Sequence, residues 1–211
     1  MTIERDPSRA PPFADSAAFF FTGWVHYPAG RRAFITSLAG TLGRRRWPPY
    51  LPTYYYGIPT TETEALELAE GFMQKMGLEP GPERGINALA LKKTLEAKGI
   101  PTKGYRVKPE DLQDYFARGG LPVIAHLTKP QKHFVVAVGM VGDEIVLADP
   151  SWGRSIIPFT ALVNERGYSG VVLVPIPPLE LAQRAQEKQK EILEWAAFRL
   201  AALARLREAL P

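Results

Sequence analysis

Residues 132–153 read KHFVVAVGMVGDEIVLADPSWG, and this stretch decides the fold. Two runs of mainly β-branched and other apolar residues flank the turn Val141-Gly142-Asp143, which is the pattern of a β-hairpin. If pairing is centred on that turn, the residue opposite His133 lies within about three positions of Asp149. The sequence therefore predicts that an imidazole and a carboxylate approach each other at one rim of a sheet.

The strands around this hairpin are short and closely spaced along the chain. Runs of β-branched and aromatic residues bounded by turn residues predict strands at 122–127, 133–138, 144–148, 155–159 and 170–174. The connections between these runs are too short to hold helical crossovers. The sheet is therefore expected to be largely antiparallel.

Three helices are predicted before the strands. Thr61 and Glu64 form a capping box for the first helix, which ends before Gly77. Asn87 caps the second helix, and Pro109 is the first residue of the third. Helices followed by an antiparallel sheet make an α+β domain.

The two ends of the chain differ from this central part. Residues 1–52 are rich in proline and show neither a helical nor a strand period, so no element is predicted there. Residues 53–177 are predicted to form the α+β domain. Residues 178–211 form an amphipathic helix whose apolar stripe either packs back on the domain, which we favour, or pairs with another chain.

The composition excludes several kinds of site. Cysteine is absent from all 211 residues, which excludes disulfides, thiolate metal sites and a thiol nucleophile supplied by this chain. The three histidines, His26, His126 and His133, have no metal-site spacing, so we expect no metal and no other cofactor. His126 ends an apolar strand, and we interpret it as structural.

The net charge of +4 comes from the N-terminal segment, because the residues after 52 hold equal numbers of basic and acidic side chains. The triplet Arg44-Arg45-Arg46 beside Trp47 is compatible with nucleic-acid binding, but a short patch without a recognition fold is more typical of a solvated charge run. No run reaches the roughly 18 apolar residues that cross a bilayer. Without a secretory signal either, we expect a cytoplasmic protein.

Several stretches together resemble peptidase family thirty-nine, the papain-like cysteine peptidases best known as double-glycine leader peptidases of bacteriocin exporters. They include Tyr54-Tyr55-Tyr56-Gly57, 121–127, 132–136 and Ala148-Asp149-Pro150, and the likeness extends over roughly residues 53–175. The resemblance implies a papain-like fold. It also implies that His133 is the general base and Asp149 its orienting partner. For an arbitrary His and Asp in a hairpin, the alternative is an ordinary strand start and turn.

The nucleophile of that family does not carry across. The resemblance implies a cysteine at the start of a helix about a dozen residues before the Tyr-Tyr-Tyr-Gly stretch, with an oxyanion-hole glutamine upstream. This sequence has Leu42-Gly43-Arg44-Arg45-Arg46-Trp47-Pro48-Pro49 there. Codons for 42–51 read two bases later can give Gly-Pro-Ala-Ala-Leu-Ala-Thr-Leu-Leu, so we hypothesise that the segment before residue 52 is read in a shifted frame.

A hydroxyl could replace the thiol, and Ser37, Thr41 and Thr53 lie in the right neighbourhood. Serine and threonine need a tightly aligned base and oxyanion hole, and the sequence shows neither. The sequence therefore predicts a cysteine-peptidase-like protein that acts on or binds peptides and is inactive as written. The alternative is a non-catalytic module that holds a peptide or unfolded polypeptide, with an exporter, or a second copy paired through the C-terminal helix, as its partner.

Overall fold

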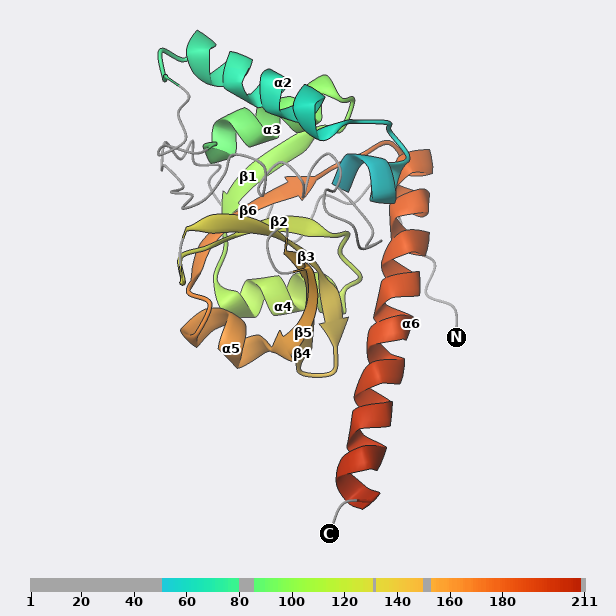
Figure 1. Cartoon of the computed structure of the whole chain (residues 1–211). Coiled ribbons are helices and arrows are strands. Elements are labelled where there is room, and N and C mark those ends of the chain that lie inside the picture. The colour runs from blue at the N-terminus through green and yellow to red at the C-terminus, as the bar shows by residue number, and fades with distance from the viewer. Residues whose placement is uncertain (1–50, 80–85, 131, 150–152, 210–211) are drawn as a thin grey trace.

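The computed structural model describes residues 51–79, 86–130, 132–149 and 153–209 (Figure 1). The arginine triplet at 44–46, the hydroxyls of Ser37 and Thr41, and all of the hypothesised frame-shift segment except Leu51 lie outside the described residues. The division of the chain after residues 52 and 177 stays a prediction.

A single sheet forms the centre of the described chain. Its strands are β1 (Thr102–Arg106), β2 (Val123–Leu127), β3 (His133–Val141), β4 (Glu144–Asp149), β5 (Gly153–Pro158) and β6 (Tyr168–Pro175). They lie in the order β1-β6-β2-β3-β4-β5, and every neighbouring pair is antiparallel. The helices are the π-helix η1 (Leu51–Tyr55), α2 (Glu62–Lys75), α3 (Ala88–Ala97), α4 (Pro109–Ala117), α5 (Phe159–Asn164) and α6 (Leu179–Ala209). The α+β prediction with an antiparallel sheet is confirmed.

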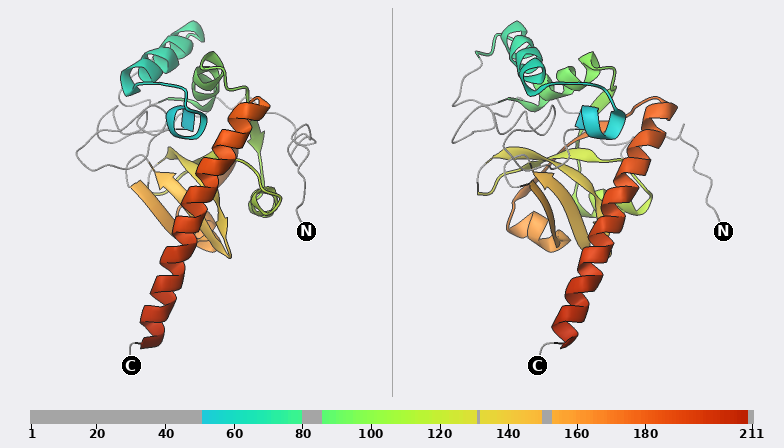
Figure 2. Two further views of the ribbon diagram at one scale, coloured as in Figure 1. Left: turned by 90° about the vertical axis from the view of Figure 1, so that its right-hand side faces the viewer. Right: turned by 45° about the vertical axis from the view of Figure 1, so that its right-hand side comes forward.

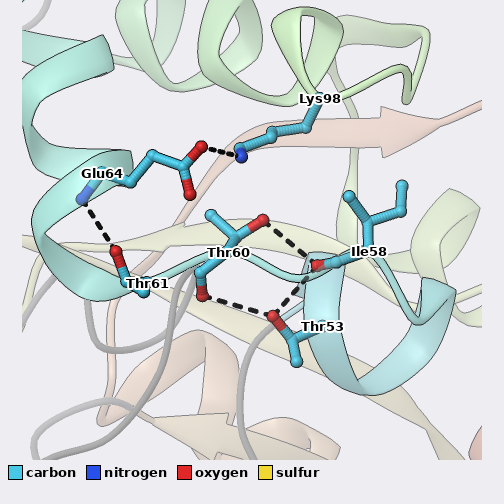
Figure 3. A network of polar contacts seen from close by, with 6 residues as sticks. All are labelled: Thr53, Ile58, Thr60, Thr61, Glu64 and Lys98. Atoms are coloured by element: carbon cyan, nitrogen blue, oxygen red, sulfur yellow. Dashed lines mark hydrogen bonds and ion pairs between the residues drawn. The ribbon is translucent and has the colours of Figure 1, made fainter.

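The helix starts follow the capping signals of the sequence. The Thr61 side chain accepts a hydrogen bond from the Glu64 amide at 3.2 Å, and the Asn87 side chain accepts one from Ala90 at 2.7 Å. The Glu64 carboxylate forms an ion pair with Lys98, the residue that follows α3 (Figure 3). Glu64, the second residue of the capping box, therefore also connects α2 to the end of α3.

The sheet separates two apolar cores, one on each face (Figure 1). One core joins η1, α2, α3 and α6 to inward residues of the sheet such as Phe134, Val136 and Val146. The other joins α4 and α5 to the opposite face, through residues such as Val135, Ala137 and Leu147. Because strand side chains alternate between faces, neighbouring residues of β3 belong to different cores.

Three elements were not predicted from the sequence. In β1, TKGYR has no run of apolar residues, and its partner β6 comes from much later in the chain. The expected strand at 155–159 ends one residue early at Pro158, and Phe159 begins the short helix α5. The π-helix η1 is too short to show a period. These elements depend on long-range packing that a local pattern does not encode.

Helix α6 has 31 residues, packs along the sheet with its first half and continues beyond it (Figure 2). Ala185, Ile192 and Ala196 are buried, whereas Leu203 and Leu206 are 47% and 61% exposed. The favoured packing of this helix on the domain thus applies to its first half, and self-association stays a prediction. Among the described residues, no helix combines the length and the apolar character needed to span a membrane.

Candidate active site

The structure brings the two predicted site residues together. His133 is the first residue of β3 and Asp149 is the last residue of β4. The imidazole Nε2 lies 2.9 Å from the carboxylate Oδ2, and the two residues are 1% and 8% exposed. This is a buried hydrogen-bonded pair with the arrangement that the resemblance implied. Its catalytic role stays a prediction.

A β-bulge in β3 makes this contact possible. From the turn, Val141, Met140 and Gly139 pair with Glu144, Ile145 and Val146, but the next pairs are Ala137 with Leu147 and Val136 with Ala148. Val138 is therefore an extra residue on β3. Without it, continuing the register would place Asp149 opposite Val136, three positions from His133 and so on the other face of the sheet. With it, Asp149 falls beside Val135, and its side chain shares a face with His133.

The contact defines what the imidazole can do. An ionised carboxylate at Nε2 accepts the proton of that nitrogen, which fixes the tautomer and makes Nδ1 the basic atom of the ring. The same carboxylate stabilises the imidazolium that forms when Nδ1 takes up a proton. The pair can therefore serve a nucleophile as a general base, provided that a nucleophile is present.

The second buried histidine is built differently. His126 Nδ1 lies 2.8 Å from the Ser169 hydroxyl, and Nε2 is buried with no hydrogen-bond partner among the described residues. Burial, together with smaller contributions from the positive charges of His133 and Lys132, lowers the pKa of His126 to about 4. In the ladder His126 lies opposite Phe134, so it faces away from the His133 side of the sheet. This arrangement supports the structural interpretation of His126.

Thr53 is the candidate substitute nucleophile within the described residues. Its hydroxyl lies 3.1 Å from the carbonyl oxygen of Ile58 and 3.4 Å from that of Thr60 (Figure 3). It therefore bonds the loop between η1 and α2. Among the described residues, no cluster of three or more histidine, aspartate or glutamate side chains could hold a metal ion.

Sequence reasoning missed Gln189, which lies on α6 and is 8% exposed. Its amide nitrogen donates to the carbonyl of Val138 at 2.6 Å and to that of Gly120 at 2.8 Å. The available signal was a single amide within the stripe of α6 that also holds Ala185 and Ile192. A polar residue at a core position requires partners, and here one partner is the bulge itself.

Comparisons with known proteins identify the family of this chain. The model of the peptidase C39 family matches residues 73–179, half of the chain. LagD of Lactococcus lactis subsp. lactis, a lactococcin-G-processing and transport ATP-binding protein, is 36% identical over 98 residues, which are 46% of this chain and 13% of LagD. The chain thus spans a small part of that relative.

Two solved structures are also similar. The peptidase domain of Streptococcus ComA, a bifunctional ABC transporter involved in quorum sensing, shares 18% identity over 74% of this chain and 98% of its own, with a TM-score of 0.52. A double-glycine-motif protease from an AMS/PCAT transporter, solved with a leader peptide, shares 31% identity over 54% of this chain and 83% of its own, with a TM-score of 0.40.

The ComA likeness supports the papain-like fold, and the family match covers β3, β4 and the hairpin between them. The sequence has no cysteine in any position. The chain belongs to the peptidase C39 family, as a cysteine-peptidase-like domain of the double-glycine leader peptidase type that has no cysteine nucleophile.

Proposed function

We propose that this chain binds an extended peptide segment at the rim formed by His133 and Asp149 and does not cleave it. The observation that carries the proposal is the buried pair at 2.9 Å in a chain without any thiol. A base and its orienting acid have no acyl-transfer chemistry of their own when the attacking group is missing. What is left of such a site is its shape and its hydrogen-bonding groups.

Peptide recognition does not need the thiol. Extended peptides are held by main-chain hydrogen bonds to strand edges and by pockets for alternate side chains. Among the described residues, β5 pairs only with β4 and so forms one edge of the sheet, and its first residue, Gly153, lies opposite Asp149. A peptide along this edge would pass directly beside the pair.

The relatives suggest which peptide this is. LagD processes lactococcin G, and the solved double-glycine-motif protease holds a leader peptide. We therefore propose a double-glycine leader segment as the ligand and an exporter of such peptides as the functional partner. The cytoplasmic location expected from the sequence belongs to the same proposal.

A single peptide tests binding and cleavage together. A synthetic double-glycine leader peptide that continues a few residues past its Gly-Gly pair is titrated into the full chain by calorimetry, and the mixture is analysed by mass spectrometry. We expect a dissociation constant of about 10 μM or tighter and an intact peptide. An analogue with a photoreactive side chain next to the Gly-Gly pair should crosslink to the adjoining ends of β3, β4 and β5.

The alternatives have clear signatures. Cleavage that disappears in His133→Ala and persists in the matched variant His126→Ala would show an active peptidase with another nucleophile. Crosslinks confined to surfaces remote from these strand ends would move the binding site elsewhere. Absence of binding to all double-glycine leaders tested would refute the proposed ligand.

A further inference from the structure

The amide of Gln189 joins three elements at one point. It lies on α6, and its nitrogen bonds the carbonyl of Val138 on β3 and that of Gly120, three residues before β2. Both acceptors lie where β2 and β3 diverge, because Val123 opposite Ala137 is the last pair of that ladder. The two hydrogens of one side-chain amide thus replace the ladder bonds that the strands no longer make.

Val138 is the extra residue of the bulge, and its side chain is fully buried. A bulge interrupts the ladder, so its carbonyl needs a partner from elsewhere. A buried carbonyl without a partner is strongly unfavourable. Without the bulge, the register of β3 against β4 would shift by one residue from Val138 onward. The Val138 carbonyl would then no longer point at α6. The bond from Gln189 therefore favours the bulged register over the regular one.

The neighbouring Gly139 lets the helix come close enough to make this bond. A Cβ at Gly139 would lie 3.0 Å from Leu193 Cδ1 and 3.3 Å from the Gln189 nitrogen, which is tighter than ordinary van der Waals contact. A larger residue at this position would force the Leu193 side chain and the Gln189 amide to shift by a few tenths of an ångström. Gly139 thus leaves the space that the Gln189 amide occupies when it bonds the Val138 carbonyl.

We propose that Gln189 is a positioning residue that holds the Val138 bulge and thereby keeps Asp149 on the same face of the sheet as His133. The argument has two steps. First, the bulge determines on which face of the sheet Asp149 lies. Second, Gln189 supplies the hydrogen bond that the Val138 carbonyl in the bulge needs. Helix α6 begins where the family match ends, at residue 179, so Gln189 lies outside the matched part of the chain, whereas the bulge that it bonds lies inside it. The proposal concerns the geometry of the pair and is independent of which peptide binds there.

The register can be read directly because the chain has no cysteine of its own. Val136 lies opposite Ala148 in the bulged register, whereas Ala137 would lie opposite Ala148 in the regular one. Two reporter chains are made, Val136→Cys with Ala148→Cys and Ala137→Cys with Ala148→Cys. Each is combined with Gln189→Met, which keeps the length of the side chain and removes its donors. The matched control is Gln183→Met, at an exposed position of the same helix.

The measurement is the rate of disulfide formation in a glutathione buffer, followed by mass spectrometry. In the unmodified background and in Gln183→Met, the 136/148 pair should close fast and the 137/148 pair slowly. In Gln189→Met, the ratio of the two rates should fall about tenfold, the change expected when a buried carbonyl loses its bond. A loss of global stability with an unchanged ratio would overturn the proposal, because it would make Gln189 a packing residue only.

The Gln189→Met chain could fail to fold when reduced. Refolding under oxidising conditions then decides the question, because a disulfide between 136 and 148 imposes the bulged register. Recovery of the fold by this crosslink, but not by the one between 137 and 148, supports the proposal. Failure of both crosslinks to restore the fold overturns it.

Discussion

Two adjoining parts of the sheet each hold a buried histidine and differ in what the ring meets. In the β3–β4 rim, His133 contacts the carboxylate of Asp149 at 2.9 Å. In the β2–β6 contact, His126 meets the hydroxyl of Ser169 at 2.8 Å. The two rings belong to consecutive pairs of one ladder and are 1% and 7% exposed. Their residue type and burial are therefore nearly the same.

The difference lies in the charge of the partner. A carboxylate stabilises the imidazolium, so His133 can accept a proton in a site from which water is excluded. A hydroxyl carries no charge, and burial then dominates and lowers the pKa of His126 to about 4. A buried histidine can thus act as a base only where the fold also places a carboxylate beside the ring. In this chain the bulge at Val138 places the Asp149 carboxylate on the face of the sheet where His133 lies.

Restoring the thiol should have the largest effect on this contrast. The repaired chain carries Leu42→Cys and the shifted-frame residues Gly-Pro-Ala-Ala-Leu-Ala-Thr-Leu at 43–50. We expect it to cleave the double-glycine peptide slowly, because the oxyanion-hole glutamine is still missing, whereas the chain as written does not cleave it. In the repaired chain, His133→Ala should lower the cleavage rate by about 100-fold or more, the share of a general base. The matched variant His126→Phe should retain the rate within about threefold.

Peptide cleavage followed by mass spectrometry checks this prediction, with the chain that carries Leu42→Cys alone as a second control. Equal losses in the His133 and His126 variants would show that the two rings are not functionally distinct. No cleavage by a folded repaired chain would argue against the frame-shift hypothesis and against His133 as a competent base.

The second contrast is in stability. Asp149→Ala leaves a buried imidazole without its acid and should lower the free energy of unfolding by about 3 kcal/mol. Ser169→Ala removes a neutral partner of His126 and should lower it by about 1 kcal/mol. Urea unfolding followed by circular dichroism measures both. Similar losses for the two variants would mean that the His133–Asp149 contact is an ordinary neutral hydrogen bond.

Local signals in the sequence were enough to find most of the elements. Thr61, Asn87 and Pro109 begin helices as expected, because capping and first-turn preferences act within a few residues. The strands of the hairpin follow from their β-branched runs and from the turn between them. By contrast, β1 depends on a partner that lies about 70 residues later in the chain, and no local pattern predicts such pairing.

The sequence predicts that His133 and Asp149 lie close together, but it does not predict the orientation of their side chains. Hairpin counting brings Asp149 near His133 along the strands, yet it does not tell on which face the carboxylate lies. That depends on one extra residue, Val138, whose identity does not distinguish it from the other valines of β3. Its position is set by Gln189, 51 residues further along the chain. A contact of this kind is defined only when the tertiary structure is formed.

The smallest expected effect is a pH dependence that belongs to His126 alone. Its pKa is about 4 in the folded chain and near 6.5 when unfolded. Between these values the unfolded state binds more protons, so the free energy of unfolding falls as the pH is lowered from 6.5 towards 4. His126→Phe removes this contribution. Between pH of about 7.5 and about 5.8, the unmodified chain should lose about 1 kcal/mol more than the variant.

Urea unfolding at the two pH values measures this difference, and Ser169→Ala serves as the control because it keeps the titrating ring. Lys132 and His133, the other cationic groups that act on His126, are retained in all three chains, so their own pH dependence largely cancels in the comparison. Identical slopes for the unmodified chain and His126→Phe would show that the His126 ring is protonated as readily when folded as when unfolded. The β2–β6 histidine would then resemble the β3–β4 histidine in its protonation, and the partner's charge would no longer explain their difference.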